Sequence, residues 1–401
     1  MISPHQITAV NLVTATPLRR VPVQRAGFRL ARAPDWVARI FNERALLVQV
    51  KTFNFLHTAR WVWLGRFPCV DRDQPREARF GPRWVVYLGN YDGPWRPYFG
   101  AFMEAMSEGV YDIWGQSVGY PGFPAAGTAN RLQAWLETRV PPSQHYYAAY
   151  PWATANDVRS AVRVRREVRS AALDLQARGT AEGERVTTVF DDLARRLRDC
   201  LGPIAPPAWH PPDEPAAILP DGRVRGFVAA FPVRRGEERQ ITDAIEALPR
   251  GTGSPFRRVP GTHFARLAVL DKETIGCHPD GKPVPVQSSY LLFAADYDAA
   301  SPEDATGAGF VASVYEHMPD EVRAIWTHCY GFDAAVPGPG ARFAALAEKC
   351  RRPILLEFMD CPDQSLGSVL DALRRHGMFV ELVRRRTSRR EIAARDLFAF
   401  L

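Results

Sequence analysis

An internal repeat is the feature of this sequence that most restricts its fold. "LVTATPLRR" (12–20) matches "FVAAFPVRR" (227–235) at an offset of 215 residues, and "LHTARWVWL" (56–64) matches "THFARLAVL" (262–270) at an offset of 206. Three more pairs follow in the same order, at offsets of 206, 212 and 211: "VVYLGNYD" with "LLFAADYD", "DIWGQSVGY" with "AIWTHCYGF", and "YYAAYPWATANDV" with "EFMDCPDQSLGSV". Five ordered blocks with short insertions between them predict two similar units in one chain.

Each unit has the same predicted order of elements, βαββαβ. Runs rich in β-branched and aromatic residues predict strands, and apolar residues at helical spacing predict helices. In the first unit we expect strands at 7–18, 55–64, 83–91 and 144–149, with helices at 34–49, at 95–114 and from 154 onward. In the second unit we expect strands at 223–233, 263–271, 287–298 and 352–358, with helices at 236–249, at 303–326 (broken at Met318-Pro319) and at 363–376.

This order is that of the ferredoxin-like split βαβ unit, which gives an antiparallel four-stranded sheet with helices on one face. The bare face of each sheet needs a partner, and the other unit supplies one. We therefore predict an α+β fold of two tandem ferredoxin-like units, 1–155 and 223–401, packed as a pseudo-dimeric α+β barrel. Residues 156–222 form the predicted connector, which is Arg/Glu-rich and helical at first and then rich in proline.

Charge and cysteine content narrow the class of protein. The chain of 401 residues has a formal net charge of +7, almost all of it from arginine, with clusters at "RVRREVR" (163–169) and "RRRTSRR" (384–390). No RNA-binding signature or zinc finger accompanies them, so a solvated basic surface is favoured over nucleic-acid binding. Six scattered cysteines without a CxxC pair favour a reduced, cytoplasmic protein. No secretory signal or apolar run of about 20 residues is present, so we expect no membrane span; a homo-oligomer is a possible assembly.

The repeat places His57-x-Ala59-Arg60 on one predicted strand and His263-x-Ala265-Arg266 on its counterpart. Residue alternation puts Thr58, Arg60, Val62 and Leu64 on one face of the first strand. An arginine that faces the space between two sheets needs a carboxylate or an anionic ligand. The neighbouring strands offer such carboxylates, so Arg60–Asp92 and Arg266–Asp298 are the predicted partners.

Gly89-Asn90-Tyr91-Asp92-Gly93 follows the third predicted strand and has two interpretations. Asn, Asp and Gly are typical turn residues, and an Asp in front of a helix caps its free N–H groups. Alternatively, Asp92 is a catalytic carboxylate. The counterpart "AADYDAA" lacks both glycines but keeps the second aspartate. A position kept in both units is more easily explained by a role in the fold.

Two units of this kind resemble the α+β-barrel superfamily, and within it the dye-decolorising peroxidases, which carry a Gly-x-x-Asp-Gly motif that residues 89–93 match. The resemblance implies haem between the second unit's sheet and its helices, with Asp92 and Arg60 on the distal side. It also implies a proximal histidine from the second unit, for which His317 and His328 are candidates, and Arg266 is a further candidate cofactor contact. The blocks "HxAR", "YLGNYDG" and "DIWxxxxGY" look still more like bacterial duplicated proteins without a settled activity.

Three functions remain open at this point. The first is a haem-binding, peroxidase-like oxidoreductase that acts on a small organic molecule. The second is a cofactor-free barrel that binds or transforms an apolar or aromatic small molecule. The third is a non-enzymatic structural or interaction protein. No pair of histidines has the spacing of a non-haem metal site, such as HExxH.

Overall fold

The computed structural model describes twelve segments of the chain: residues 9–17, 54–64, 69–75, 84–94, 96–100, 128–137, 143–178, 183–201, 223–272, 287–299, 307–388 and 392–400. The strands are β1 (Ala9–Pro17), β2 (Leu56–Leu64), β3 (Trp84–Asp92), β4 (Ser143–Ala148), β5 (Arg223–Pro232), β6 (Thr262–Leu270), β7 (Tyr290–Ala299) and β8 (Ile354–Met359). Each of them overlaps a strand predicted from the sequence.

The helices agree with the prediction in part: those expected from 154 onward and at 236–249, 303–326 and 363–376 are present, whereas those at 128–137 and 339–350 were not predicted. The described helices are α4 (Thr128–Glu137), α5 (Ala155–Ala177), α6 (Gly183–Arg196), α7 (Glu238–Glu246), α9 (Ala308–His317), α10 (Pro319–Trp326), α11 (Pro339–Cys350), α12 (Leu366–Thr387) and α13 (Ala394–Phe398). Short 3₁₀ turns lie at Arg198–Cys200, Gly251–Gly253 and Pro255–Arg258. The predicted break at Met318-Pro319 is confirmed, because α10 begins at Pro319. The helix expected at 34–49 and the proline-rich segment 202–222 lie outside the described residues.

The strands form two antiparallel four-stranded sheets, which confirms an α+β fold. Their orders are β1-β3-β2-β8 and β5-β7-β6-β4. The expectation that each half builds its own sheet is wrong in one respect, because β4 lies beside β6 and β8 lies beside β2. Single hydrogen bonds connect β5 with the chain on either side of β8, from Arg352 N to Val228 O and from Val224 N to Pro362 O. No ladder closes the described strands into a barrel.

The two sheets have the same internal registers. Ala59 pairs with Gly89 in the first sheet, and Ala265 pairs with Ala295 in the second, so both partners are shifted by the 206 residues of the sequence alignment. The exchanged strands also agree, since Arg60 faces Glu357 and Arg266 faces Tyr146. Bulges interrupt β2 and β6 at equivalent places, at His57 and His263. Each residue of one sheet can therefore be compared with a defined counterpart in the other.

Because side chains alternate between the two faces of a strand, every second residue of each strand faces the space between the sheets. At one end the space is apolar, and a buried cluster joins Val62, Leu64 and Leu88 of the first sheet to Leu270 and Leu292 of the second. Burial of this kind stabilises the pair of sheets by about 25 cal/mol per Å² of apolar surface. At the other end the same faces carry polar residues. Arg60 faces the space between the sheets and is buried there, which is the condition under which the sequence requires a carboxylate or anionic partner.

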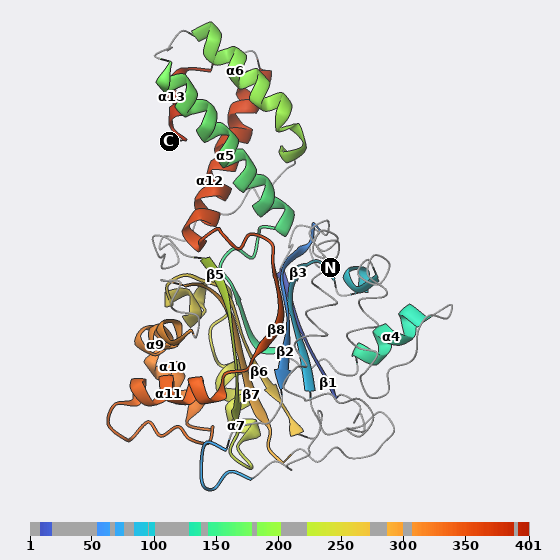
Figure 1. Cartoon of the computed structure of the whole chain (residues 1–401), viewed down its shortest axis with the longest axis vertical. Coiled ribbons are helices and arrows are strands. Elements are labelled where there is room, and N and C mark those ends of the chain that lie inside the picture. The colour runs from blue at the N-terminus through green and yellow to red at the C-terminus, as the bar shows by residue number, and fades with distance from the viewer. Residues whose placement is uncertain are drawn as a thin grey trace, which may run out of the picture.

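The outer face of the second sheet is covered by α7, α9, α10 and α11 (Figure 1). Aromatic side chains fill the layer between sheet and helices. Phe231, Phe293, Trp326 and Phe343 are each fully buried, and their ring centroids lie 5.1 to 6.4 Å apart where they meet. Helix α11 was not predicted from the sequence, although its Phe343 belongs to this core.

A helical arm formed by α5, α6, α12 and α13 projects beyond the polar end of the two sheets (Figure 1). Helices α5 and α12 both begin at the sheets and run outward side by side, which makes them parallel. Apolar residues on their facing sides, including Val164, Val168, Phe379 and Leu382, form a separate core with Phe190 of α6. None of the described helices is long and apolar enough to cross a membrane.

Candidate functional site

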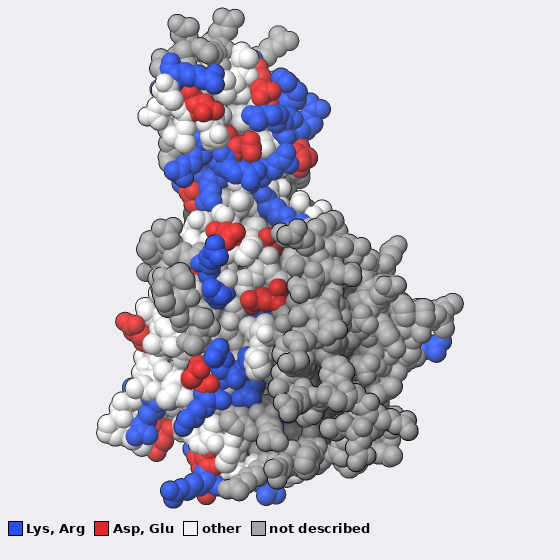
Figure 2. Space-filling model, in the orientation of Figure 1, with Lys and Arg blue, Asp and Glu red and all other residues white. Residues whose placement is uncertain are grey.

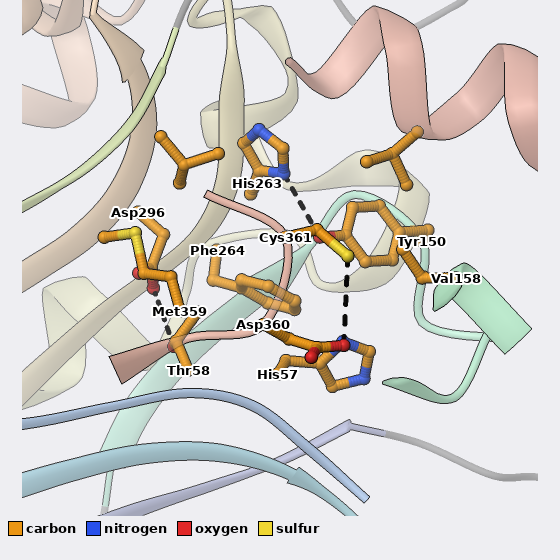
Figure 3. Close-up of a pocket in the computed structure, with 12 residues that line it drawn as sticks. His57, Thr58, Tyr150, Val158, His263, Phe264, Asp296, Met359, Asp360 and Cys361 are labelled. Atoms are coloured by element: carbon orange, nitrogen blue, oxygen red, sulfur yellow. Dashed lines mark hydrogen bonds between the residues drawn. The ribbon is translucent and has the colours of Figure 1, made fainter. Parts of the chain in front are cut away.

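A small cavity lies where the two sheets meet the arm (Figure 3). It is bordered by His57 and Thr58 of β2, His263 of β6, Tyr150 and Cys361, and the first turns of α5 and α12 close it. The cavity has about 30 Å³ for water-sized occupants, which suits about one or two water molecules. It is therefore the place where the polar ends of both sheets, two histidines and a thiol come together.

His57 and Asp92 form a pair that connects the first sheet to the arm. His57 Nε2 donates to Asp92 Oδ1 at 3.0 Å, and Asp92 Oδ2 accepts from Ala155 N of α5 at 2.7 Å. Both side chains are less than 10% exposed. Carboxylates favour helix N-termini because the first N–H groups lack acceptors within the helix. Asp92 was predicted to cap the helix that directly follows it, whereas in the structure its carboxylate accepts from the first turn of α5, which begins 63 residues later; Gly93 follows with φ +85°.

The second sheet repeats this arrangement. His263 Nε2 donates to Asp298 Oδ1 at 2.9 Å, and Asp298 Oδ2 accepts from Leu366 N of α12 at 2.8 Å. Thr154 and Ser365 cap the same two helices through their hydroxyl groups. Each helix of the parallel pair is therefore fixed to the sheets through one buried His–Asp pair.

The carboxylates that contact Arg60 are not the predicted one, Asp92. The Arg60 guanidinium contacts Asp296 of β7, on the opposite sheet, and lies 3.2 Å from Glu357 of the exchanged strand β8. It also donates to Ala295 O at 2.9 Å. The predicted pair Arg60–Asp92 is wrong because the bulge at His57 directs that histidine to Asp92, while Arg60 points between the sheets.

Arg266 contacts two neutral side chains, and the nearby carboxylate of Asp296 also acts on its guanidinium. Arg266 donates to the side-chain oxygen of Asn90, and its guanidinium lies 5.7 Å from the centroid of the Tyr146 ring. The predicted pair Arg266–Asp298 is therefore also wrong, since Asp298 accepts from His263. Asn90 occupies the position equivalent to Asp296, and its amide nitrogen donates to Asp296 Oδ2 at 2.9 Å. The two sheets thus differ in charge at this pair of equivalent positions.

Burial governs the electrostatics of this buried polar cluster, defined as Thr58, Arg60, Asn90, Tyr146, Arg266, Asp296 and Glu357. Desolvation raises the pKa of Glu357, and Arg60 opposes that shift. Desolvation lowers the pKa of Arg266. Two arginines and two carboxylates balance formally, so the cluster is neutral as a whole. A buried group of this kind is stable only while each charge keeps its partner.

Neither histidine proposed as a haem ligand lies at this cavity. His317 ends α9 and its Nδ1 lies 2.9 Å from Ser313 O, while His328 follows α10 and its Nδ1 lies 2.8 Å from Glu237. A cofactor site of haem size needs about 300 Å³ or more. The cavity is an order of magnitude smaller, and buried aromatic rings fill the layer between the second sheet and its helices. Neither this cavity nor the packed layer beside the second sheet has room for haem in the part of the chain that the structure describes, and the haem hypothesis stays a prediction.

Two further histidines offer no ligand at the cavity: one is held by a neighbouring side chain within the second sheet, and the other lies outside the described residues. His145 is a buried residue of β4 with Nε2 2.9 Å from Ser254 Oγ, and burial lowers its pKa to about 4. His210 lies outside the described residues. Among the described residues, no group of three His, Cys, Asp or Glu side chains is placed to hold a metal ion.

Sequence reasoning missed Cys361 and Tyr150, which are counterparts in the weakest of the five repeat blocks. Tyr150 Oη donates to His263 Nδ1 at 3.1 Å. The signal was present in the alignment, because a tyrosine and a cysteine at one repeat position differ in chemistry as well as in size. A comparison of the whole chain with models of known protein families and with curated proteins finds no match.

Proposed function

We propose that this chain is a duplicated, ferredoxin-like interaction protein whose helical arm binds an acidic surface of another protein. The matched registers of the two sheets and the matched His–Asp caps support a duplication that forms a pseudo-dimer. The polar residues between the sheets are engaged with one another, and their cavity suits only water-sized occupants. The chemistry of the inner faces therefore supports the fold, and recognition belongs to the outer surface.

The observation that carries this proposal is the charge of the arm. Its described residues include sixteen arginines, no lysine and ten acidic residues. Figure 2 shows these basic side chains gathered over the projecting helices. Arg169, Arg178 and Arg384 are exposed, and no described side chain pairs with their guanidinium groups. An arginine-rich surface of this sign attracts an acidic partner and directs its approach.

The pattern of charge favours a protein over a nucleic acid. Arginines alternate with carboxylates along the arm, as in Arg195–Asp192 and Arg374–Asp371. Such a mosaic would oppose a uniformly negative phosphate backbone at many points. Leu173 of α5 is the exposed large hydrophobic residue of the described part, 48% exposed and one turn from Arg169. An apolar contact flanked by arginines is typical of protein interfaces.

The arm is also held in a defined position, as a recognition surface requires. Arg386 of α12 binds both carboxylate oxygens of Asp191 in α6 at 2.9 Å, which joins the two helices. Arg159 of α5 binds Asp360 at 2.5 Å, close to the start of α12. A preorganised surface loses less entropy when its partner binds.

The test uses the full chain and two labelled probes. One probe is a helical peptide of about 20 residues, similar in length to α5, in which Glu and Leu residues occupy successive turns. The other probe is a DNA duplex of similar total charge. Binding is followed by fluorescence anisotropy at low and at physiological salt. The variant Arg169→Glu/Arg178→Glu/Arg384→Glu is compared with a matched control on the body of the protein, Arg235→Glu/Arg239→Glu/Arg342→Glu.

We expect the peptide to bind the wild type more tightly than DNA does. Three exposed pairs at about 0.5 kcal/mol each amount to about a tenfold loss of affinity in the arm variant. The body variant should lose less than about threefold, because it changes the same net charge at a distance greater than the screening length. Tighter binding of DNA would assign the arm to nucleic acid, and equal losses in both variants would remove the arm as a site.

A further inference from the structure

The buried face of α12 in the arm contains one polar residue, His376, which is 0% exposed. The other buried residues of the helix are apolar: Leu366, Val369, Ala372, Leu373, Phe379 and Leu382. A helix that packs by an apolar stripe gains most from an apolar side chain at each buried position. A buried polar side chain costs free energy unless its hydrogen bonds are satisfied. The partners of the two ring nitrogens therefore decide what His376 does in the core of the arm.

The Nε2 atom of His376 has a partner and the Nδ1 atom does not. Nε2 lies 2.6 Å from the carbonyl oxygen of Cys200, in the 3₁₀ turn Arg198–Cys200 that follows α6. A carbonyl oxygen accepts hydrogen bonds, so Nε2 carries the proton and Nδ1 is the basic nitrogen of the neutral ring. Nδ1 is buried without a hydrogen-bond partner among the described residues. The neutral ring thus connects α12 to the turn, and a second proton on the ring would have no acceptor.

The charged groups around the ring do not compensate for its burial. The titratable groups on the elements that meet there are Asp157 and Arg163 of α5, Asp199 and Cys200 of the turn, and Arg375 of α12. Asp199 is paired with Arg163 at 2.7 Å, and Arg375 is paired with Asp371 at 2.7 Å. Burial lowers the pKa of His376 and outweighs the bond to Cys200 O and the charge of Asp157, which both raise it.

We infer that His376 is an acid-sensitive latch, which holds the turn Arg198–Cys200 on α12 while the ring is neutral and releases the turn when the ring takes a second proton. Separation of the turn from α12 brings Nδ1 into contact with water, where an imidazolium is stable. The released form therefore binds the proton more tightly than the closed form. The closed form keeps its full stability above about pH 6.5, the ordinary pKa of histidine, and loses stability as the pH falls below that value.

The other contacts of the turn permit a local opening. The ion pair between Asp199 and Arg163 has side chains that are 68% and 44% exposed, and exposed pairs contribute little to stability in water. Cys200 packs in the apolar core of the arm, which is separate from the cores of the two sheets. Opening at the turn can therefore leave the sheets intact, as in the local unfolding of other proteins. It is a property of the arm's own packing and does not depend on what the arm binds.

The test follows the thiol of Cys200, which lies in the released turn. A dipyridyl disulfide reacts with thiols in mildly acidic solution, and mass spectrometry resolves the individual cysteines. Each rate is divided by the rate of free cysteine at the same pH, so that the titration of the thiol cancels. Cys200 is 5% exposed, and Cys329 and Cys350 of the body are 0% exposed, so all three react through opening.

Between pH 7 and pH 5 we expect the relative rate of Cys200 to rise at least about fivefold, within the limit of tenfold per pH unit that one proton sets. Cys200 should react faster than Cys329 and Cys350 throughout. A flat profile for Cys200 would overturn the latch. Equal relative rates for all three cysteines would also overturn it, because they would assign the exposure to unfolding of the whole chain.

The variant His376→Gln tests the ring directly, because its side-chain amide can donate to Cys200 O and does not titrate. The matched control is His145→Gln, which replaces a buried histidine of β4 whose Nδ1 also has no partner among the described residues. The rise at Cys200 should disappear in His376→Gln and persist in His145→Gln. A rise that persists in His376→Gln would refute the role of the histidine.

Amide hydrogen exchange of the wild-type protein gives a second measurement, which decides the question if His376→Gln does not fold. After correction for intrinsic exchange rates, protection of the turn Arg198–Cys200 should fall at least about fivefold between pH 7 and pH 5. Strand β6, which is buried along its whole length, should stay better protected than the turn at both pH values. Unchanged protection of the turn would contradict the latch.

Discussion

The buried arginine Arg60 offers the sharpest test of how the two sheets are held together. We consider Arg60→Met, which keeps much of the side-chain length and removes the charge. In the native protein the guanidinium is 2% exposed and contacts Asp296, Glu357 and the carbonyl oxygen of Ala295. The substitution leaves two carboxylates between the sheets without their cation.

Loss of one member of a buried ion pair costs about 3–5 kcal/mol in the free energy of unfolding. We expect the lower end of this range at pH 7, about 3 kcal/mol. Asp296 keeps hydrogen bonds from Asn90 and Thr58 after the change, and the side chain of Glu357 is 29% exposed. This loss is still a large part of the total stability of a typical domain, which is about 5–15 kcal/mol.

The deficit should depend on pH in a defined direction. Burial already raises the pKa of Glu357, and Arg60 is the main group that lowers it. Without Arg60 the folded-state pKa rises further above the unfolded value, so the folded protein binds the proton more tightly. The variant therefore gains stability as pH falls through that pKa, and its deficit relative to the wild type should shrink between pH 7 and pH 5.

Urea denaturation followed by tryptophan fluorescence measures both quantities. Arg239→Met is the control, because Arg239 is 91% exposed and only 3.7 Å from Asp243 in an i,i+4 pair; it should cost less than about 0.5 kcal/mol. The double variant Arg60→Met/Asp296→Asn should cost less than the sum of the two single changes by about 1 kcal/mol or more. A deficit below about 1 kcal/mol for Arg60→Met, or one that does not change with pH, would refute the reasoning.

Three further changes follow from the same contacts. Gly226→Ala would place a Cβ in a clash with the side chains of Glu357 and Arg60 and should cost about 1–3 kcal/mol. Gly377→Ala in α12 has open space around its Cβ and should stabilise the protein by about 0.5–1 kcal/mol. Thermal melting compares the two variants. Asp298→Asn removes a charged acceptor from the first turn of α12 and should lower the free energy of unfolding by about 1–2 kcal/mol. Amide hydrogen exchange should become faster in the first turn of α12 and stay unchanged in α7. Haemin titration should give no stoichiometric Soret band, and such a band would restore the haem hypothesis.

Much of the local structure could be predicted from the residues. Runs of β-branched and aromatic residues placed all eight described strands to within a few residues. Alternation along β2 grouped Arg60 with Thr58, Val62 and Leu64 on one face, and Met318-Pro319 ended one helix and began the next. These features depend on a period of two or on the missing N–H of proline, and both are properties of neighbouring residues.

Partners across the sheets could not be predicted in the same way. The sequence indicated that Arg60 needs a carboxylate and offered the nearest one on the adjacent strand, Asp92. The structure gives that aspartate to His57, because a bulge changes which side chains of β2 face it. Arg60 instead contacts Asp296, which lies 236 residues away in the chain. A bulge of one residue has no clear sequence signal here, and it changes locally which side chain of β2 meets Asp92.

The sequence by itself predicted two similar units and determined where the described strands run and which residues share a face, because repeats and periodicity are written in residue order. The tertiary structure decided that β4 and β8 change sheets, that α5 and α12 form a parallel arm, and that a thiol and two histidines share one cavity. Two similar units present nearly identical strand edges, and backbone N–H and C=O groups do not distinguish which unit supplies the next strand. That choice is made by packing of the whole molecule.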